Sequence, residues 1–230
     1  NNRSHHMGDP DYYNVPMKSL LSQERTLELI KTMSLKKATP SSKIKPLDIK
    51  NESRNTTHYS IVDKDGNAVS NTFTLGYSFG SGVTIPGTGV LLNNQMGNFA
   101  YRYGDSVVQG RAGSPANKYE PGKRPMSTMA PTMVFNANKE LMLITGSPGG
   151  STIPASILRV ISGVIDFNLD IGAATMLPRV HKDWPYKGLD YETTISNDTL
   201  SILNNIGHTL EPDRTIGSTQ SIHIVNGINY

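Results

Sequence analysis

The 230-residue sequence contains no cysteine, so it can form no disulfide and offers no thiolate to a metal ion. This absence is compatible with the periplasm and with the cytoplasm, so it leaves the compartment open. A large excess of charge of one sign is also lacking, because 22 Lys and Arg stand against 19 Asp and Glu. The cations occur singly or in pairs and form no basic stripe, which argues against nucleic acid as a partner.

Long apolar runs are absent as well. The stretch over residues 157–165 is interrupted by Arg159 and Ser162, and it is much shorter than the ~20 residues that span a bilayer. The sequence therefore predicts no membrane span in this segment. Hydrophobic residues make up 36% of the chain, which is enough for the packed core of a globular protein.

The spacing of apolar residues predicts a mixture of strands and helices. Ser22 can cap a short amphipathic helix over residues 22–33, and the proline-containing stretch 38–55 is typical of an exposed linker. The other expected elements are a β-hairpin at 58–62 and 68–75, strands at 132–135 and 141–145, helices at 153–167 and 198–206, and a strand at 221–225. This order indicates layers of sheet and helix rather than strict βαβ repetition.

A pair of threonines stands where the polar linker meets the first strand. If the hydroxyl of Thr56 attacks the carbonyl of Asn55, an N-to-O acyl shift followed by hydrolysis leaves Thr56 as a new N-terminus. The freed α-amino group, with a pKa of about 8, can act as general base for the hydroxyl beside it. Composition alone favours a simpler interpretation, in which Thr56 and Thr57 only begin a strand.

Several longer motifs change that balance, because together and in this order they resemble the gamma-glutamyltransferase family. Its small subunit is matched by residues 56–63 (TTHYSIVD), 65–69 (DGNAV), 89–96 (GVLLNNQM), 123–132 (KRPMSTMAPT) and 146–150 (GSPGG). The end of its large subunit is matched by residues 3–4 (RS), 8–11 (GDPD) and 40–42 (PSS). Several long motifs in one order are far more specific than any single short pattern.

The resemblance implies both a fold and an activity. The fold is the α+β N-terminal nucleophile (Ntn) hydrolase fold, a four-layer αββα sandwich that the large subunit completes. Residues 1–55 would be the tail of the large subunit with its linker, and residues 56–230 the catalytic small subunit without its C-terminal end. The activity is γ-glutamyl transfer from glutathione or a related amide to water or an amino acid, without a cofactor, after autocatalytic cleavage between Asn55 and Thr56 yields a heterodimer. The resemblance also implies a periplasmic or secreted enzyme.

The same resemblance implies a catalytic group of four residues. Thr56 would be the nucleophile for self-cleavage and for attack on the γ-glutamyl carbonyl, and Thr74 would orient its hydroxyl. Gly149 and Gly150 would offer backbone N–H groups to the oxyanion. Each such donor can contribute ~3 kcal/mol of transition-state stabilisation.

Four further residues would bind the substrate. The resemblance implies that Ser127 and Thr128 bind its α-carboxylate and that Gln95 and Asn98 contact its α-amino end. Many family members carry an acidic residue where this chain has Asn98, and an uncharged amide is a weaker partner for an ammonium group. Gly76 stands where relatives often carry Asn, which removes a side chain near the bound glutamyl group.

Three alternatives remain open. Asn98 is compatible with a related acylase or a poly-γ-glutamate depolymerase of altered acyl specificity. A catalytically inactive homologue is another possibility, although Thr56, Thr74 and the glycine pair argue against it. Residues 76–80 (GYSFG) also match the G-x-S-x-G pattern of serine hydrolases, which would make Ser78 the nucleophile. That pattern requires a helix directly after the serine, and the glycines and proline that follow favour a chance match.

Overall fold

The computed structural model describes residues 6–40, 43, 56–100, 115–183, 188–213 and 215–230. Along them the elements are α2 (Met17–Leu20), α3 (Gln23–Lys31), β1 (Thr57–Val62), β2 (Ala68–Phe73), η2 (Gln95–Asn98), η3 (Pro115–Asn117), β3 (Thr132–Phe135), β4 (Leu141–Gly146), η4 (Gly150–Thr152), α4 (Ile153–Ile165), α5 (Ile171–Met176), β5 (Val180–His181), β6 (Gly188–Glu192), α6 (Asn197–Asn205), β7 (Thr209–Asp213), β8 (Gln220–Val225) and β9 (Ile228–Asn229). Within these residues, no helix is both long and apolar enough to cross a lipid bilayer.

The hairpin that the sequence predicts after Thr56 is present as the antiparallel pair β1–β2. Its turn is organised by Asp63, whose Oδ1 accepts hydrogen bonds of 2.9 Å from the backbone N–H groups of Asp65 and Asn67. Gly66 has a φ of +83°, a conformation that glycine adopts without steric cost. Local turn chemistry therefore fixes the register that sets Thr57 opposite Phe73 at the open end of the hairpin.

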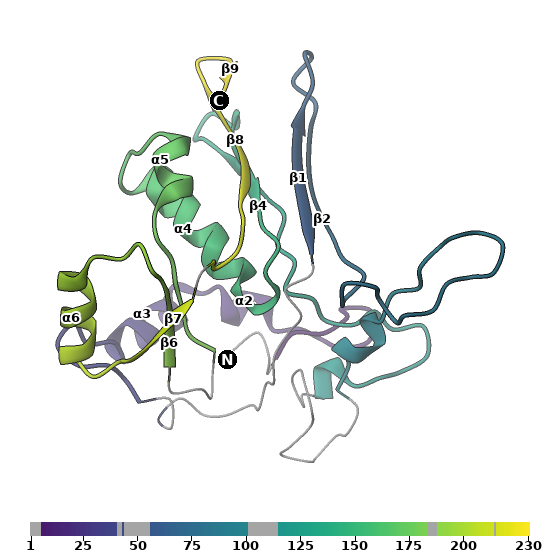
Figure 1. Ribbon diagram of the computed structural model, residues 1–230, viewed down its shortest axis with the longest axis horizontal. Coiled ribbons are helices and arrows are strands. Elements are labelled where there is room, and N and C mark those ends of the chain that lie inside the picture. The colour runs from purple at the N-terminus through teal and green to yellow at the C-terminus, as the bar shows by residue number, and fades with distance from the viewer. Residues whose placement is uncertain (1–5, 41–42, 44–55, 101–114, 184–187, 214) are drawn as a thin grey trace.

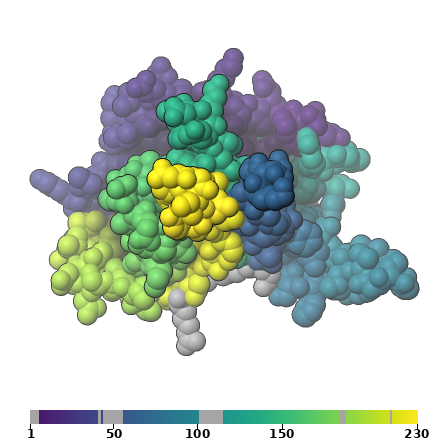
Figure 2. All heavy atoms as spheres, turned by 90° about the horizontal axis from the view of Figure 1, so that it is seen from above, coloured from purple at the N-terminus to yellow at the C-terminus, as the bar shows by residue number. Residues whose placement is uncertain are grey.

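A four-stranded sheet in the order β3-β4-β8-β9 lies beside this hairpin. In Figure 1, β1 and β2 lie on one side of β4 and β8, and α4 and α5 lie on the other. Figure 2 shows the same arrangement from above, with the yellow C-terminal strands between the green helices and the blue hairpin. The described residues thus form an α-β-β series of layers, in agreement with three layers of the predicted sandwich.

Helix α4 supplies the core between the helical layer and the sheet. Its apolar residues recur at helical spacing, and Ile153, Ile157, Val160 and Val164 are buried. Pro at the second helical position is tolerated because the first N–H groups of a helix have no partner within it. Helix α5 packs closely on α4, and a Cβ atom on Gly163 would lie 2.9 Å from the Cβ of Ala174.

The sequence patterns did not predict a third sheet, in the order β5-β6-β7, or helix α5. The strands β6 (GLDYE) and β7 (TLEPD) pair in parallel and lack a clean apolar alternation, and α5 has only six residues. Helix α6, by contrast, lies close to the predicted range, and the side chain of Ser196 caps it by accepting from Thr199 N–H. The expected linker at 38–55 lies mostly outside the described residues.

The segment before the linker packs against the rest of the chain. Ser22 caps α3 as predicted, because its Oγ accepts a hydrogen bond of 3.1 Å from Arg25 N–H. Further upstream, the carboxylate of Asp9 forms an ion pair with Arg124. Figure 2 shows this N-terminal part in purple along one side of the molecule. Residues that the sequence assigned to different subunits therefore lie in contact.

Candidate active site

Thr56 and Thr74 stand at the open end of the β1–β2 hairpin. Thr56 directly precedes β1 and Thr74 directly follows β2, and the pairing of Thr57 with Phe73 brings the two threonines to the same place. Both are half-buried and line one open pocket of about 400 Å³. The structure therefore brings together two of the predicted catalytic residues, whereas none of the other predicted site residues lines this pocket. Asn55, on the other side of the expected cleavage point, lies outside the described residues.

The backbone after Thr74 orients its hydroxyl. The Oγ1 atom of Thr74 accepts a hydrogen bond of 2.9 Å from the N–H of Gly76. Gly76 itself has a φ of +94°, and a Cβ atom there would lie 1.9 Å from the Oδ1 atom of Asn94. The Asn94 side chain thus occupies the space that a side chain at position 76 would need, and glycine is the residue that fits.

His58 connects the hairpin to the end of β4. Its ring is buried, with Nδ1 2.8 Å from the hydroxyl of Thr72 and Nε2 3.1 Å from that of Ser60. Burial lowers the pKa of this imidazole, because it penalises the charged form. A Cβ atom on Gly146 would come within 2.1 Å of the ring, so β4 approaches His58 closely only because it has glycine there. This contact ties the strand that begins after Thr56 to the strand that leads to Gly149.

The glycine pair after β4 adopts a backbone that other residues avoid. The φ angles are +136° at Gly149 and +59° at Gly150, and a Cβ atom on Gly149 would lie 2.4 Å from Thr152 Oγ1. Both glycines are buried, and neither backbone N–H donates a hydrogen bond to another described residue. Two such N–H groups just before helix α4 are suited to bind a developing negative charge.

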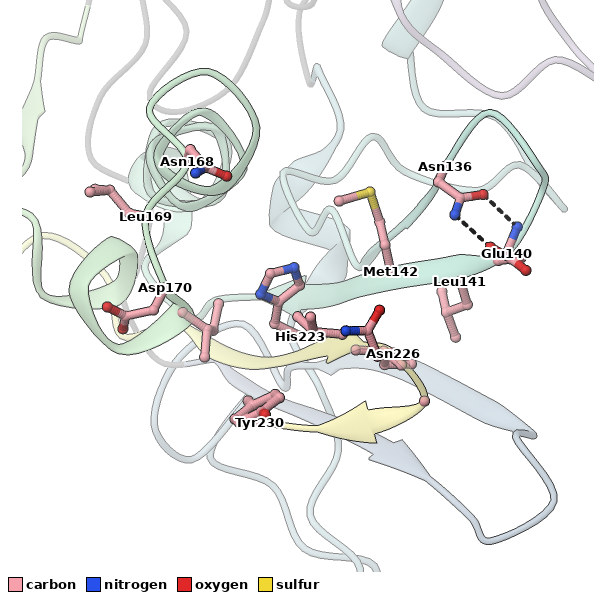
Figure 3. A pocket seen from close by; sticks show the side chains of 14 residues that line it. Asn136, Glu140, Leu141, Met142, Asn168, Leu169, Asp170, His223, Asn226 and Tyr230 are labelled. Carbon is pink, nitrogen blue, oxygen red and sulfur yellow. Dashed lines mark hydrogen bonds between the residues drawn. The ribbon is translucent and has the colours of Figure 1, made fainter.

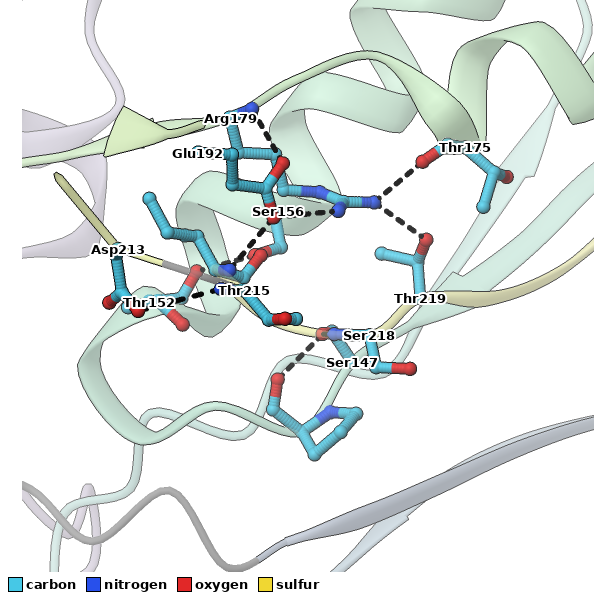
Figure 4. Close-up of polar contacts among 12 residues, drawn as sticks. Ser147, Thr152, Ser156, Thr175, Arg179, Glu192, Asp213, Thr215, Ser218 and Thr219 are labelled. Carbon is cyan, nitrogen blue, oxygen red and sulfur yellow. Dashed lines mark hydrogen bonds and ion pairs between the residues drawn. The ribbon is translucent and has the colours of Figure 1, made fainter. Parts of the chain in front are cut away.

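A buried polar network, shown in Figure 4, connects to this glycine loop through Ser147. Glu192 accepts hydrogen bonds from the backbone N–H groups of Arg179 (2.9 Å) and Ile216 (2.8 Å), and it also pairs with the Arg179 guanidinium. Two residues after Ile216, Ser218 N–H donates to Ser147 Oγ at 2.9 Å. Ser147 precedes the glycine pair by two residues, so the network fixes the approach to it. No local sequence signal pointed to these residues.

A chain of hydrogen bonds joins the other predicted residues. The Nε2 atom of Gln95 donates to the carbonyl of Thr74 at 3.4 Å, and the Nδ2 atom of Asn98 donates to Gln95 Oε1 at 2.6 Å. The carbonyl of Asn98 accepts from Asn117 Nδ2 at 2.6 Å, and Asn117 Oδ1 accepts from Met126 N–H at 3.0 Å. Met126 is followed directly by the predicted carboxylate-binding residues Ser127 and Thr128. Sequence patterns did not indicate Asn117, because its partners lie 19 and 9 residues away.

The serine-hydrolase interpretation lacks its structural context. Ser78 is exposed and lines the same pocket as Thr56, but turns and loop follow it, and the next helical element, η2, begins only at Gln95. A nucleophile elbow needs a helix immediately after its serine. The match at residues 76–80 is therefore a coincidence of glycine spacing.

A larger pocket, of about 960 Å³, lies away from all these residues. It is formed around β4, β8, β9 and the start of α5, and Figure 3 shows His223 and Tyr230 among the side chains at its wall. None of the predicted site residues lines it. A choice of site by pocket volume alone would therefore have selected this pocket and not the one that Thr56 and Thr74 line.

Comparisons with known proteins agree with the predicted family. The family model described as gamma-glutamyltranspeptidase matches residues 1–229. A glutathione hydrolase proenzyme of Escherichia coli is 42% identical over 223 residues, which cover 96% of this chain and 38% of the relative. The chain thus spans well under half the length of that relative.

Solved structures give the same result. A gamma-glutamyltranspeptidase structure from Helicobacter pylori is similar with a TM-score of 0.70 and 40% identity, covering 76% of this chain and 96% of that one. A cephalosporin acylase from Bacillus halodurans is similar with a TM-score of 0.79 and 26% identity, covering 99% of this chain and 39% of that one. These likenesses confirm the predicted Ntn hydrolase fold.

Proposed function

Because the chain belongs to the gamma-glutamyltranspeptidase family, we propose that it carries the catalytic threonine of an enzyme that transfers or hydrolyses γ-glutamyl groups. The observation that carries the proposal is the pocket that Thr56 and Thr74 share at the open end of the hairpin. The enzyme is a precursor that cleaves itself between Asn55 and Thr56, and the two products remain together as a heterodimer. It acts in the periplasm or outside the cell, as the family resemblance implies.

Acyl transfer proceeds in two halves. The Thr56 hydroxyl oxygen attacks the γ-glutamyl carbonyl carbon while its proton passes to the free α-amino group, and the resulting oxyanion is bound by Gly149 and Gly150 N–H. The C–N bond of the donor then breaks, and the leaving amine takes that proton. Water or an amino acid attacks the ester on Thr56 in the same manner and releases the product. The residues themselves supply the nucleophile, the base and the oxyanion donors, so the reaction needs no cofactor.

Recognition of the donor rests on the hydrogen-bonded chain that begins at the carbonyl of Thr74. Asn98 Nδ2 donates to Gln95, and no described residue donates to Asn98 Oδ1, so this oxygen can accept from a substrate ammonium. Ser127 and Thr128 bind the α-carboxylate through hydroxyl and backbone donors. Glutathione and other γ-glutamyl amides carry both of these groups on one carbon atom.

Asn98 also supports a second candidate, an acylase that accepts donors without the α-amino group. An amide can still accept a hydrogen bond from the ammonium group, but it lacks the negative charge with which a carboxylate would form an ion pair. The two candidates differ in one measurable ratio, kcat/KM for γ-glutamyl-p-nitroanilide over that for glutaryl-p-nitroanilide. A ratio well above one supports the γ-glutamyl enzyme, and a ratio near or below one supports the acylase.

The first experiment follows self-cleavage of the full-length precursor by intact mass and N-terminal sequencing. We expect the wild type to split between Asn55 and Thr56, and Thr56→Ala to remain whole. Thr57→Ala is the matched control, because it removes the adjacent hydroxyl, which is exposed on β1, and it should split normally. A wild type that stays intact, or a Thr56→Ala variant that splits equally well, would overturn the assignment. Ser78→Ala should leave both cleavage and activity unchanged.

A further inference from the structure

The side chain of Asn117 is fully buried. It lies between the two segments that bind the substrate in the proposed function, one with Asn98 and one with Ser127. Asn117 ends η3 and has no exposed surface. Its Nδ2 atom donates to the carbonyl of Asn98 at 2.6 Å, and its Oδ1 atom accepts from Met126 N–H at 3.0 Å. Its own carbonyl accepts from Ala100 N–H at 2.9 Å. Asn117 therefore binds three backbone groups from two separate segments, two through its side-chain amide and one through its own carbonyl.

One partner of the Asn117 side chain belongs to a proposed substrate-binding residue, and the other belongs to a residue directly before one. Asn98 is itself the proposed partner of the α-amino group, and its side chain is bonded to Gln95, which in turn reaches the carbonyl of Thr74. Met126 directly precedes Ser127, the first residue of the carboxylate-binding pair. The contact is thus a bridge between the amine-binding and the carboxylate-binding segments.

An amide of this length satisfies both backbone groups at neutral pH, where a carboxyl group is ionised. A carbonyl needs a donor and an N–H needs an acceptor, and Asn presents one of each on a single planar group. A carboxylate at position 117 could serve Met126 N–H but would face the Asn98 carbonyl with no proton to donate. An aliphatic side chain would leave both groups unpaired in a buried site, which is strongly unfavourable.

The amino and carboxylate groups of a γ-glutamyl donor are bonded to the same carbon atom, so the segments that bind them must converge at a fixed separation. Misplacement of such a segment by about 1 Å can cost two orders of magnitude in rate or affinity. We propose that Asn117 is a positioning residue that sets this separation, and thereby determines how tightly the site binds donors that carry both groups. The inference rests on the proposed γ-glutamyl function and extends it to a residue that does not touch the substrate.

The test uses the full-length processed enzyme and two substitutions, Asn117→Asp and Asn117→Leu. For γ-glutamyl-p-nitroanilide we expect KM to rise about tenfold or more in Asn117→Leu, since two buried partners are lost, while kcat changes by less than about threefold. Glutaryl-p-nitroanilide lacks the α-amino group, so the preference for the γ-glutamyl donor over it should fall in the same variant.

Asn117→Asp separates positioning from general damage through its pH dependence. A protonated carboxyl group can donate to Asn98 O and accept from Met126 N–H, and so reproduces the amide, whereas the carboxylate cannot. Between pH 5 and pH 8, KM of Asn117→Asp divided by that of the wild type should therefore rise as the pH rises. This series also keeps the inference testable if Asn117→Leu does not fold.

Ile157→Ala is the stability control, because Ile157 is buried in α4 and forms none of these hydrogen bonds. If it lowers Tm as much as the Asn117 variants and raises KM equally, Asn117 has only a structural role. A pH-independent KM ratio in Asn117→Asp, or an unchanged KM in Asn117→Leu, would also overturn the inference. Failure of the proposed function looks different, because the wild type itself would then not hydrolyse γ-glutamyl-p-nitroanilide.

Discussion

Asp9 and Arg124 lie 115 residues apart in sequence and form a multiply bonded ion pair. The backbone N–H of Arg124 donates to Asp9 Oδ2 at 2.8 Å and its Nε donates to the same oxygen at 3.0 Å. The Asp9 side chain is 1% exposed. If the chain is cut before Thr56, this pair joins the two products, and Arg124 lies three residues before Ser127, a proposed carboxylate-binding residue.

Substitution of Asp9 should weaken the association of the two subunits after cleavage. Asp9→Asn removes the charge that these N–H donors surround, so we expect the subunits of the processed enzyme to separate at a clearly lower urea concentration, measured by size-exclusion chromatography. Asp11→Asn is the matched control, because Asp11 contacts the same guanidinium but its side chain is 72% exposed. Exposed ion pairs contribute ~0.2–1 kcal/mol, so the control should differ little from wild type.

The effect of Asp9 should depend on pH in a defined direction. The hydrogen bonds and charge of Arg124 hold the pKa of the Asp9 carboxyl well below its usual range. A carboxyl with a lowered pKa stabilises the folded state above its unfolded pKa of about 3.9, and this stabilisation is lost as the pH falls further. The difference between wild type and Asp9→Asn should therefore persist from pH 7 to pH 5 and shrink below about pH 4. An unchanged difference at pH 3 would contradict this account.

The contact between His58 and Gly146 gives a second prediction. Gly146→Ala places a methyl group within 2.1 Å of the imidazole ring, so the hairpin must move away from β4. Overpacking of this kind typically costs ~1–3 kcal/mol in the free energy of unfolding, measured by urea titration. His58→Ser should remove most of that cost in the double variant, because the colliding ring is gone. Additive effects of the two substitutions would mean that the strain has another source.

His58 should also make stability depend on pH near neutrality. Burial lowers its pKa, and the groups around the ring are the neutral hydroxyls of Ser60 and Thr72. The unfolded state then binds a proton more readily than the folded state, so stability is complete above the unfolded pKa of about 6.5 and falls at lower pH. One proton gives a limiting slope of about 1.4 kcal/mol per pH unit. We expect His58→Gln to flatten the urea-unfolding profile between pH 7 and pH 5, and an equally steep profile would contradict the assignment.

The parts of the fold that the sequence predicted well are those specified by local interactions. Helix α4 has a strong apolar periodicity, α3 has its capping serine, and the hairpin has its Asp-Gly-Asn turn. Helix α5 is too short for periodicity to emerge, and strands β6 and β7 are stabilised by pairing with each other across the intervening helix α6. Their local sequences are compatible with loop, and only tertiary contacts decide otherwise.

The candidate site divides in the same way. Thr56 and Thr74 were identified because motifs surround them, and the hairpin register then explains why they share a pocket. Asn117 and Glu192 act through buried hydrogen bonds to backbone groups that are distant in sequence. A lone Asn or Glu in a polar stretch has no pattern that distinguishes a buried hydrogen-bond partner from a solvated side chain, so only the structure identifies such residues.

Glu192 provides the last prediction, because its carboxylate connects the core to the loop that carries the proposed oxyanion donors, Gly149 and Gly150. Its oxygens accept from Arg179 N–H, Ile216 N–H and the Arg179 guanidinium. In Glu192→Ala the two backbone N–H groups would lose their acceptor, and the guanidinium would lose its carboxylate while keeping its hydrogen bonds to Thr175 and Thr219. Removal of one partner of a buried ion pair costs ~3–5 kcal/mol, so the free energy of unfolding in urea should fall by that order.

Activity should fall together with stability in Glu192→Ala. Release of Ile216 frees Ser218, whose N–H donates to Ser147 two residues before Gly149, so the proposed oxyanion donors lose their support. The double variant Arg179→Met/Glu192→Leu separates the effect on stability from the effect on activity, since an apolar pair of similar volume can restore stability. If it recovers stability but not kcat, the network is needed to hold the glycine loop in place. In this double variant the backbone N–H of Ile216 still lacks its acceptor. Recovery of both stability and kcat would therefore mean that packing alone holds the glycine loop in place.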